Sequence, residues 1–333
     1  MESGKLNAGY PFASVIVIVY NMEKTIKKCL DSLVGLDYPK NCYEIIVVDG
    51  SSTDGTQKIV REYMGKYKVR MLVEKRKVRG YARNLGTKQA RGEIIAYIDA
   101  DCSAGRRWLI THVNDHVNNA HVGAVGGAIQ HSSYDDSDVG IDFSRPLIAM
   151  EAGEYLPSAP KRYVSQIPTC NASFKKQIFN EVGFFEDGLH VTEDTELCYR
   201  TLKNGYKILF DPEARVIHHD DYRFKEYIKA RSLPSGVGMR LFMDKYFDGG
   251  KIHYRLQLVN KSVSYRLPMS SLLIFILFPG IVGMRVIRNF HKMRYVTPKR
   301  RLINFVPYVL LASISWVSGY LVESIKRVNI IQG

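Results

Sequence analysis

The sequence predicts an α/β fold: a doubly wound sheet in the first two thirds, followed by a basic, membrane-associated region. Short β-branched apolar runs alternate with segments of helical spacing, and each run ends in a polar loop. The 333 residues are 46% apolar and 24% charged, which allows a sizeable core and excludes disordered and fibrous classes. Ligands of such sheets bind at the carboxyl ends of the strands. We therefore expect the functional site there.

The first unit of this sheet is a strand followed by a helix. Residues 14–20 (SVIVIVY) form a short β-branched run, which is typical of a buried parallel strand. Asn21 is expected to cap the helix that follows, in which Ile26, Leu30 and Leu33 recur at helical spacing.

The same pattern continues along the chain, with three more strands and two more helices. Further strands are expected at 44–49, 69–74 and 93–98, and further helices at 56–66 and 80–91. A turn-rich loop, 50–55, separates the second strand from its helix. Four strands that alternate with helices predict parallel pairing with right-handed crossovers.

The surplus of positive charge is confined to the last third of the chain. Residues 222–333 hold 19 Lys and Arg against 4 Asp and Glu, whereas the other residues are almost balanced. The same third contains two uncharged apolar runs, Leu267–Met284 and Leu302–Val322. Basic residues beside such runs indicate a membrane surface with anionic lipids rather than a nucleic acid.

The cysteines and the N-terminal residues indicate the cellular compartment of the protein. Five cysteines, an odd number without a C-x-x-C pair, argue against a disulfide framework and against a thiolate zinc site. The first residues lack the pattern of a secretory signal. We therefore expect the N-terminal part to lie in the cytosol. Together with the basic, apolar last third, this predicts a protein at the cell membrane whose N-terminal domain faces the cytoplasm.

The membrane topology follows from the distribution of basic residues. Residues 285–301 carry seven Lys and Arg and no acid, and Pro279-Gly280 interrupts the apolar run before them. Basic loops favour the cytosolic side. We expect the first run to form a re-entrant or interfacial hairpin, with 1–266 and 285–301 both cytosolic. Whether Leu302–Val322 crosses the membrane stays open.

A pair of carboxylates follows the fourth strand. Asp99 and Asp101 flank one residue and suit a hard cation, Mg²⁺ or Mn²⁺, although a solvated turn has the same pattern. No G-x-G-x-x-G follows the first strand and no P-loop motif occurs, which argues against dehydrogenases and P-loop kinases.

A second acidic pair, Glu193-Asp194, precedes a segment of helical spacing. Thr192 is a plausible N-cap, which places both acids in the first helical turn, where the macrodipole keeps a carboxylate ionised. An ionised carboxylate there can act as a general base. The alternative is that both acids only stabilise the helix.

Two further groups carry positive or titratable side chains. Residues 212–219 read as a strand that ends in His218 and His219, which could bind a metal or a diphosphate or could simply be surface residues. Arg79 and Arg83 open the helix after the third strand. They could clamp a phosphate or remain solvated.

Taken in order, these motifs resemble family 2 glycosyltransferases of the GT-A fold over residues 12–245. The motifs are Tyr20-Asn21 with Glu23, Asp49-Gly50-Ser51, Ala82-Arg83-Asn84-Leu85-Gly86, Asp99-Ala100-Asp101, Asn171-Ala172-Ser173-Phe174, Glu193-Asp194 with Leu197 and Arg200, and Pro212-x-Ala214-x-Val216-x-His218. The resemblance implies a Rossmann-like transferase domain at 12–245 and a membrane-associated region at 246–333. Residues 231–234 do not reproduce the Q-x-x-R-W motif of processive synthases.

The resemblance also implies roles for individual residues. Asp101 would bind Mn²⁺ or Mg²⁺ with His218 nearby, and Asp194 would remove the proton of the acceptor hydroxyl, so that the sugar is transferred with inversion. Nucleotide-sugar binding is implied for Tyr20, Asn21, Glu23, Asp49, Ser51, Arg83, Asp99 and Glu193. The expected partners are a nucleotide-diphosphate sugar, a lipid-linked or membrane-proximal glycan acceptor and membrane lipids, with no nucleic acid. The alternatives are a polyprenyl-phosphate glycosyltransferase and a non-catalytic membrane-surface scaffold.

Overall fold

The computed structural model describes residues 9–131, 155–187, 189, 191–219, 228–247, 251–258, 261–268, 282–283, 287, 306–326 and 329–332. They fall into two compact units: the first contains the sheet expected from the sequence, and the second contains the elements from residue 228 onward. Apart from residue 287, the basic segment 285–301 lies outside the described residues, as does most of the apolar run 267–284, so the expected hairpin is untested.

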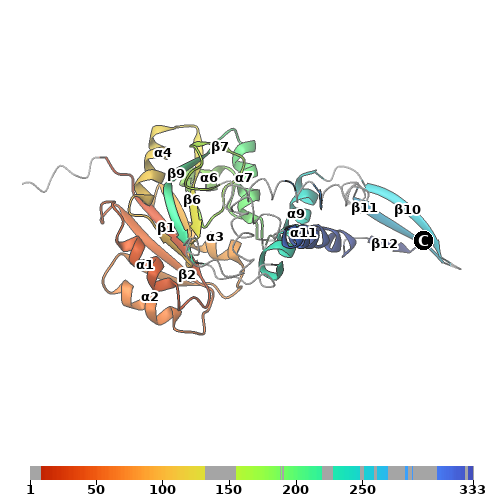
Figure 1. Cartoon of the computed structure of the whole chain (residues 1–333), viewed down its shortest axis with the longest axis horizontal. Helices are drawn as coiled ribbons and strands as arrows, with labels where there is room; N and C mark the ends of the chain where they lie inside the picture. The colour runs from red at the N-terminus through yellow and green to blue at the C-terminus, as the bar shows by residue number, and fades with distance from the viewer. Residues whose placement is uncertain are drawn as a thin grey trace, which may run out of the picture. The chain divides into compact units, whose positions relative to one another are not determined.

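A nine-stranded sheet forms the centre of the first unit (Figure 1), with the strand order β3-β2-β1-β4-β8-β6-β9-β5, and β7 paired to β9. The strands are β1 (Ala13–Val19), β2 (Tyr43–Asp49), β3 (Val69–Val73), β4 (Ile94–Asp99), β5 (Cys102–Ala104), β6 (Val122–His131), β7 (Arg162–Val164), β8 (Asn171–Lys175) and β9 (Lys207–His218). The first four are parallel, as the sequence predicts. Beyond them β8 runs antiparallel to β4 and β6, so the sheet is mixed.

Among the described residues, the helices of this unit are α1 (Ile26–Val34), α2 (Thr56–Met64), α3 (Arg79–Gln89), α4 (Trp108–Asn118), α6 (Lys176–Glu181) and α7 (Glu193–Lys203). The first three of them follow the parallel strands β1, β2 and β3. All seven residues of β2 are buried, which a strand covered on both faces requires. On one face α3 approaches closely at Gly86, where a Cβ would lie 2.8 Å from Cγ2 of Ile16 and 3.1 Å from Cγ2 of Val48.

A chain of buried hydrogen bonds joins α4 to β8. The Asn171 side-chain oxygen accepts from Trp108 (2.7 Å) and lies 3.1 Å from Nε2 of His112, while the Ser173 hydroxyl is 2.9 Å from Nδ1 of His112 and 2.9 Å from Nε2 of His116. Because the Asn171 oxygen only accepts, His112 donates to it from Nε2. Burial lowers the pKa of both histidines and so favours their neutral forms. A neutral His112 accepts at Nδ1 from the Ser173 hydroxyl, which in turn accepts from Nε2 of His116.

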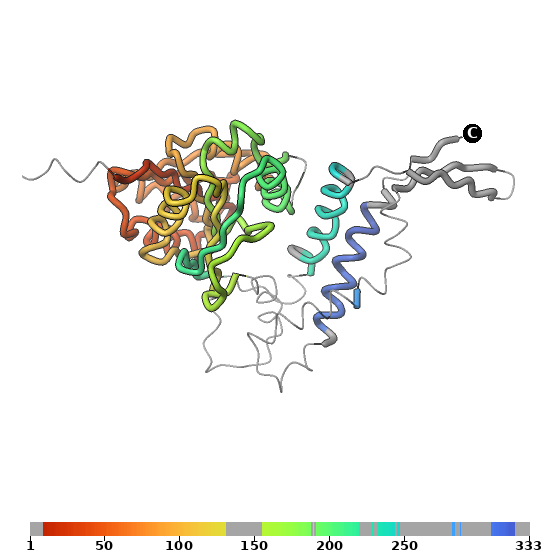
Figure 2. The backbone as a smooth tube through the Cα atoms, turned by 90° about the horizontal axis from the view of Figure 1, so that it is seen from above, coloured from red at the N-terminus to blue at the C-terminus, as the bar shows by residue number. Residues whose placement is uncertain are grey.

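The second unit contains the π-helix η1 (Ile228–Ser232), the helices α9 (Leu233–Phe247) and α11 (Val306–Lys326), and a three-stranded antiparallel sheet. The helices α9 and α11 pack closely (Figure 2), and glycine at the contact points allows this approach. A Cβ on Gly236 would lie 1.9 Å from the Trp316 carbonyl oxygen, and one on Gly319 would lie 2.2 Å from the Leu233 carbonyl oxygen. The sheet has the order β10 (Lys251–Leu258), β11 (Lys261–Pro268) and β12 (Asn329–Gln332).

Two sequence expectations concern this second unit. The sequence predicts that the apolar run from Leu267 begins a membrane-associated segment. In the structure Leu267 lies in the ladder between β11 and β10, opposite Ile252, and this pairing does not test the prediction. Among the helices that the structure describes, none combines the length and the apolar content that a membrane crossing requires.

The buried histidines predict a pH-dependent stability. Burial is the main cause that lowers the pKa of His112 to about 4 and that of His116 to about 3, from 6.5. Protonation then favours the unfolded chain, so the stability present above pH 6.5 is lost as the pH falls. We expect the free energy of unfolding to drop by about 1 kcal/mol per histidine between pH 6 and pH 5.

Urea titrations at several pH values measure this slope. His116→Gln should reduce it by about half, whereas His121→Gln, at an exposed position, should leave it unchanged. Equal slopes in all three proteins would contradict the assignment.

Candidate active site

Polar residues gather where the parallel strands end. Since β1 pairs with β2 on one side and β4 on the other, Asp49 lies opposite Val19 and Asp99 lies opposite Ile18. The two carboxylates therefore flank the end of the central strand β1, as expected for ligands at the carboxyl edge of a sheet.

The loops after β1 and β2 are tied to one another. Asn21 adopts a left-handed conformation (φ 51°), its N–H donates to the Ser52 hydroxyl (2.9 Å) and its side-chain oxygen accepts from the Thr53 N–H (2.8 Å). The expected helix cap at Asn21 is therefore wrong: α1 begins after Thr25, and the Asn21 side chain is occupied across the loops.

Two more contacts complete this connection. The Glu23 N–H donates to Asp54 (3.1 Å), and the Glu23 carboxylate accepts from the Gly55 N–H (2.8 Å). Beside these loops the exposed ring of Tyr20 lies under the Lys77 ammonium group, which is 4.6 Å from the ring centre and 3.0 Å from the hydroxyl. The two loops thus form a hydrogen-bonded rim, and the Tyr20 side chain beside it is partly exposed.

Asp49 is fully buried at the base of this rim. One of its oxygens accepts from the Ser52 N–H (2.9 Å) and from the Gln57 side-chain amide (2.7 Å). The other oxygen, Oδ1, has no hydrogen-bond partner among the described residues. Ser51, directly after the strand, has a positive φ of 65°. A buried acceptor without a partner costs free energy unless a ligand donates to it.

A second group joins the end of β4 to the end of β9. One ligand atom from each of Asp99, Asp101 and His218 lies within 4.8 Å of the others, and Asp101 Oδ1 is 3.6 Å from Nε2 of His218. Two carboxylates and an imidazole form a donor set that suits Mn²⁺, and the carboxylates suit Mg²⁺. The strand expected at 212–219 is the second half of β9, and its end places His218 here.

Arg83 of α3 is buried between two acids. Its guanidinium forms an ion pair with Glu193 through one nitrogen and approaches Asp99 Oδ1 at 3.5 Å through another. Burial raises the pKa of Glu193, although the positive charge of Arg83 opposes this shift. The side chain that the sequence suggested as a phosphate clamp thus links α7 to β4.

Asp194 follows Glu193 in the first turn of α7, where the sequence predicts it. It is half-buried, and its Oδ1 accepts from the Thr195 N–H at 2.7 Å. The expected side-chain cap by Thr192 is wrong, because its hydroxyl has no partner among the described residues and its φ is 78°. A β-branched residue in that region is strained.

Two residues next to this group were not expected from the sequence. The sulfur atoms of Cys102 and Cys170 lie within 4.8 Å of each other and of a His218 ring nitrogen. Without a short Cys spacing, the only local signal is that Cys102 follows Asp101 and Cys170 precedes Asn171.

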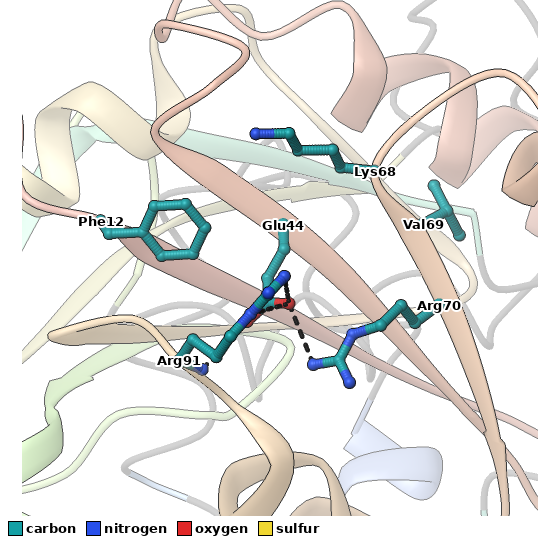
Figure 3. A pocket seen from close by; sticks show the side chains of 6 residues that line it. All are labelled: Phe12, Glu44, Lys68, Val69, Arg70 and Arg91. Carbon is teal, nitrogen blue, oxygen red and sulfur yellow. Dashed lines mark hydrogen bonds and ion pairs between the residues drawn. The ribbon is translucent and has the colours of Figure 1, made fainter. Parts of the chain in front are cut away.

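A cavity of about 450 Å³ lies at the opposite, amino edge of the sheet (Figure 3). Its buried Glu44 accepts from Ser14 (2.8 Å), Arg70 (2.9 Å) and Arg91 (2.9 Å). Burial would raise the pKa of Glu44, but the hydrogen bonds from Arg91 and Ser14 outweigh it and hold the pKa below its usual value. None of the site residues expected from the sequence lines this cavity.

Comparison with known proteins points to one family. The family model for glycosyl transferase family 2 matches residues 14–183. Glycosyltransferase AglE of Haloferax volcanii is 33% identical over 210 residues, which are 62% of this chain and 67% of that protein. A dolichyl N-acetyl-alpha-D-glucosaminyl phosphate 3-beta-D-2,3-diacetamido-2,3-dideoxy-beta-D-glucuronosyltransferase of Methanococcus voltae is 26% identical over 71% of this chain and 76% of its own.

Among solved structures, a mannosyltransferase from Pyrobaculum calidifontis, in complex with GDP-Man and Mn²⁺, has a similar fold. The TM-score is 0.62 at 18% identity, and the match covers 96% of this chain and 88% of that chain.

The buried position of Arg83 predicts a large effect on stability. Arg83→Leu leaves Glu193 and Asp99 without their counter-ion, and the free energy of unfolding should fall by about 3–5 kcal/mol. Adding Glu193→Gln should restore part of this loss. Urea unfolding of the single and double variants measures the coupling.

Arg106→Leu is the matched control, since Arg106 is 80% exposed and paired with Asp37 on the surface. This change should cost less than about 1 kcal/mol. Similar losses for Arg83→Leu and Arg106→Leu would contradict the structural role of Arg83.

Proposed function

The chain belongs to glycosyl transferase family 2, and we propose that it is an inverting transferase that moves a sugar from a nucleotide-diphosphate donor to a hydroxyl group of a glycan acceptor. The observation that carries this proposal is the convergence of Asp99, Asp101 and His218 at the carboxyl edge of the sheet, beside an acidic helix start that Arg83 links to Asp99.

The rim formed by the loops after β1 and β2 would hold the nucleoside. The second oxygen of Asp49, without a partner among the described residues, can accept from an N–H of the base, and the exposed ring of Tyr20 offers a stacking surface. We assign Asn21, Glu23 and Ser51 to the shape of this rim, because Asn21 and Glu23 bind the facing loop and Ser51 turns the chain after Asp49.

The diphosphate would lie at the carboxylate and histidine group. Asp101 and His218, with Asp99 beside the ribose, have the donor types to hold Mn²⁺ or Mg²⁺. When bound, such a cation stabilises the negative charge of the departing nucleoside diphosphate. The mannosyltransferase of similar fold binds GDP-Man together with Mn²⁺, which supports this assignment.

Asp194 is the residue to which we assign the general base. It is a half-buried carboxylate in the first turn of α7, directly after Glu193. It would take the proton from the acceptor hydroxyl as that oxygen attacks the anomeric carbon from the face opposite the leaving group. Glu193, held by Arg83, fixes the start of α7 and so positions Asp194.

The acceptor that we propose is a lipid-linked or membrane-proximal glycan. The Methanococcus voltae relative is named for a sugar on dolichyl phosphate, and the charge surplus of 222–333 suits an anionic membrane surface. We propose residues 12–245 as the transferase domain and 246–333 as a membrane-associated region, with the transferase facing the cytoplasm.

The proposed cation site predicts the effect of removing one carboxylate. Asp101→Ala should abolish metal-dependent donor turnover and leave the circular dichroism spectrum unchanged, because Asp101 lies beyond the end of β4 and outside the core. The assay measures nucleoside diphosphate release with Mn²⁺ or Mg²⁺. Glu213→Ala, which removes an exposed acid from β9, should retain activity. Full wild-type activity in excess chelator would refute the metal requirement.

The proposed base predicts a separation of transfer from binding. Asp194→Asn preserves size and the acceptor for the Thr195 N–H, but it removes the base. Transfer to a hydroxyl acceptor should fall by about 10²–10⁴-fold, while the dissociation constant of the donor should change little. Unchanged transfer at saturating donor would instead favour a phosphate acceptor, which needs no base.

A further inference from the structure

Two cysteines from distant parts of the chain lie beside His218. Cys102 begins β5, which pairs antiparallel with β9 so that Cys102 lies directly opposite His218. Cys170 immediately precedes β8. The two sulfur atoms and a ring nitrogen of His218 all lie within 4.8 Å of one another. Neither cysteine has a role in the proposed transfer reaction.

This donor set differs chemically from the carboxylate set beside it. Two thiolates and one imidazole are ligands that Zn²⁺ prefers, at bond lengths of about 2.0–2.3 Å in tetrahedral geometry. Ligands at these lengths lie roughly 3–4 Å apart, which the observed grouping accommodates with small adjustments. The carboxylates of Asp99 and Asp101 favour harder cations instead.

His218 is common to both sets. A neutral imidazole has a single nitrogen lone pair to donate, so it ligates one cation at a time. A cation held by the two sulfur atoms would therefore withdraw His218 from Asp99 and Asp101, and the two sets could not both be complete at once. Three protein ligands also leave a fourth position on a tetrahedral ion for water.

We propose that Cys102, Cys170 and His218 form a site for a thiophilic divalent cation such as Zn²⁺, and that its occupation inhibits the transferase by taking His218 from the carboxylate set. Cys102 and His218 are buried, whereas Cys170 is partly exposed, so the ion enters from the side of Cys170. Binding releases the thiol protons. The inhibition rests on the proposed function, but the binding does not.

Addition of Co²⁺ to the whole chain with its cysteines reduced tests the binding. Co²⁺ should produce a thiolate-to-cobalt charge-transfer band in the near ultraviolet at one equivalent, and Zn²⁺ should displace it. Cys170→Ser and Cys102→Ser should each weaken the band and reduce Zn²⁺ affinity at least tenfold. Cys170→Ser is the more informative variant, because a substitution at a partly exposed position disturbs the packing of the core less than one at the buried Cys102. Cys42→Ser, at another buried free cysteine, should retain the band. If the wild type gives no cobalt band, or if the band persists unchanged in both Cys170→Ser and Cys102→Ser, the proposed site is wrong.

Transfer assays test the inhibition separately. Zn²⁺ should inhibit Mn²⁺-supported transfer by the wild type, added Mn²⁺ should relieve this inhibition, and Cys170→Ser should require at least tenfold more Zn²⁺. A cobalt band with transfer that is insensitive to Zn²⁺ would refute the competition for His218 and leave the proposed function intact. A cobalt band in a protein without transfer under any cation would refute the proposed function, while the metal site would stand.

Discussion

The buried guanidinium of Arg83 is the interaction on which the geometry of the candidate site depends. It lies between Glu193 at the start of α7 and Asp99 at the end of β4, and it comes from a third element, α3. Without a positive charge there, two carboxylates would approach each other in a poorly solvated place, which is costly. The ion pairs thus allow an acidic helix start and an acidic strand end to share one edge of the sheet. The proposed general base, Asp194, directly follows Glu193, and the proposed cation ligand Asp101 lies two residues after Asp99.

The parallel half of the fold was predictable because its signals are local. The strand expected at 14–20 is β1 at 13–19, and the helix expected at 80–91 is α3 at 79–89. Such runs and spacings depend on neighbours within a few residues. The strand pairing of the mixed half was not predicted, since the antiparallel position of β8 between β4 and β6 is a property of the whole sheet.

The candidate site was also predictable only in part. The ordered motifs identified the residues that lie together at the carboxyl edge of the sheet, but they did not predict the hydrogen bonds and ion pairs that each residue makes. The sequence predicts Asn21 as a helix cap, yet its side chain binds Thr53 in another loop. It predicts Arg83 as solvated or phosphate-binding, yet Arg83 is paired with Asp99 and with Glu193, which is 110 residues away. The absence of a C-x-x-C motif argued against thiolate metal ligands. Pairing of β5 with β9 brings Cys102 and His218 together without any short spacing.

The connected loops after β1 and β2 have a thermodynamic consequence. Because Asn21, Glu23, Ser52 and Thr53 already hold the rim together, its backbone entropy is lost when the protein folds and not when a ligand arrives. A nucleotide that docks there would spend little of its interaction energy on ordering the protein. Affinity at this edge would then report chiefly the quality of the new contacts, and a substitution that frees the rim would weaken binding through entropy without removing any contact to the ligand.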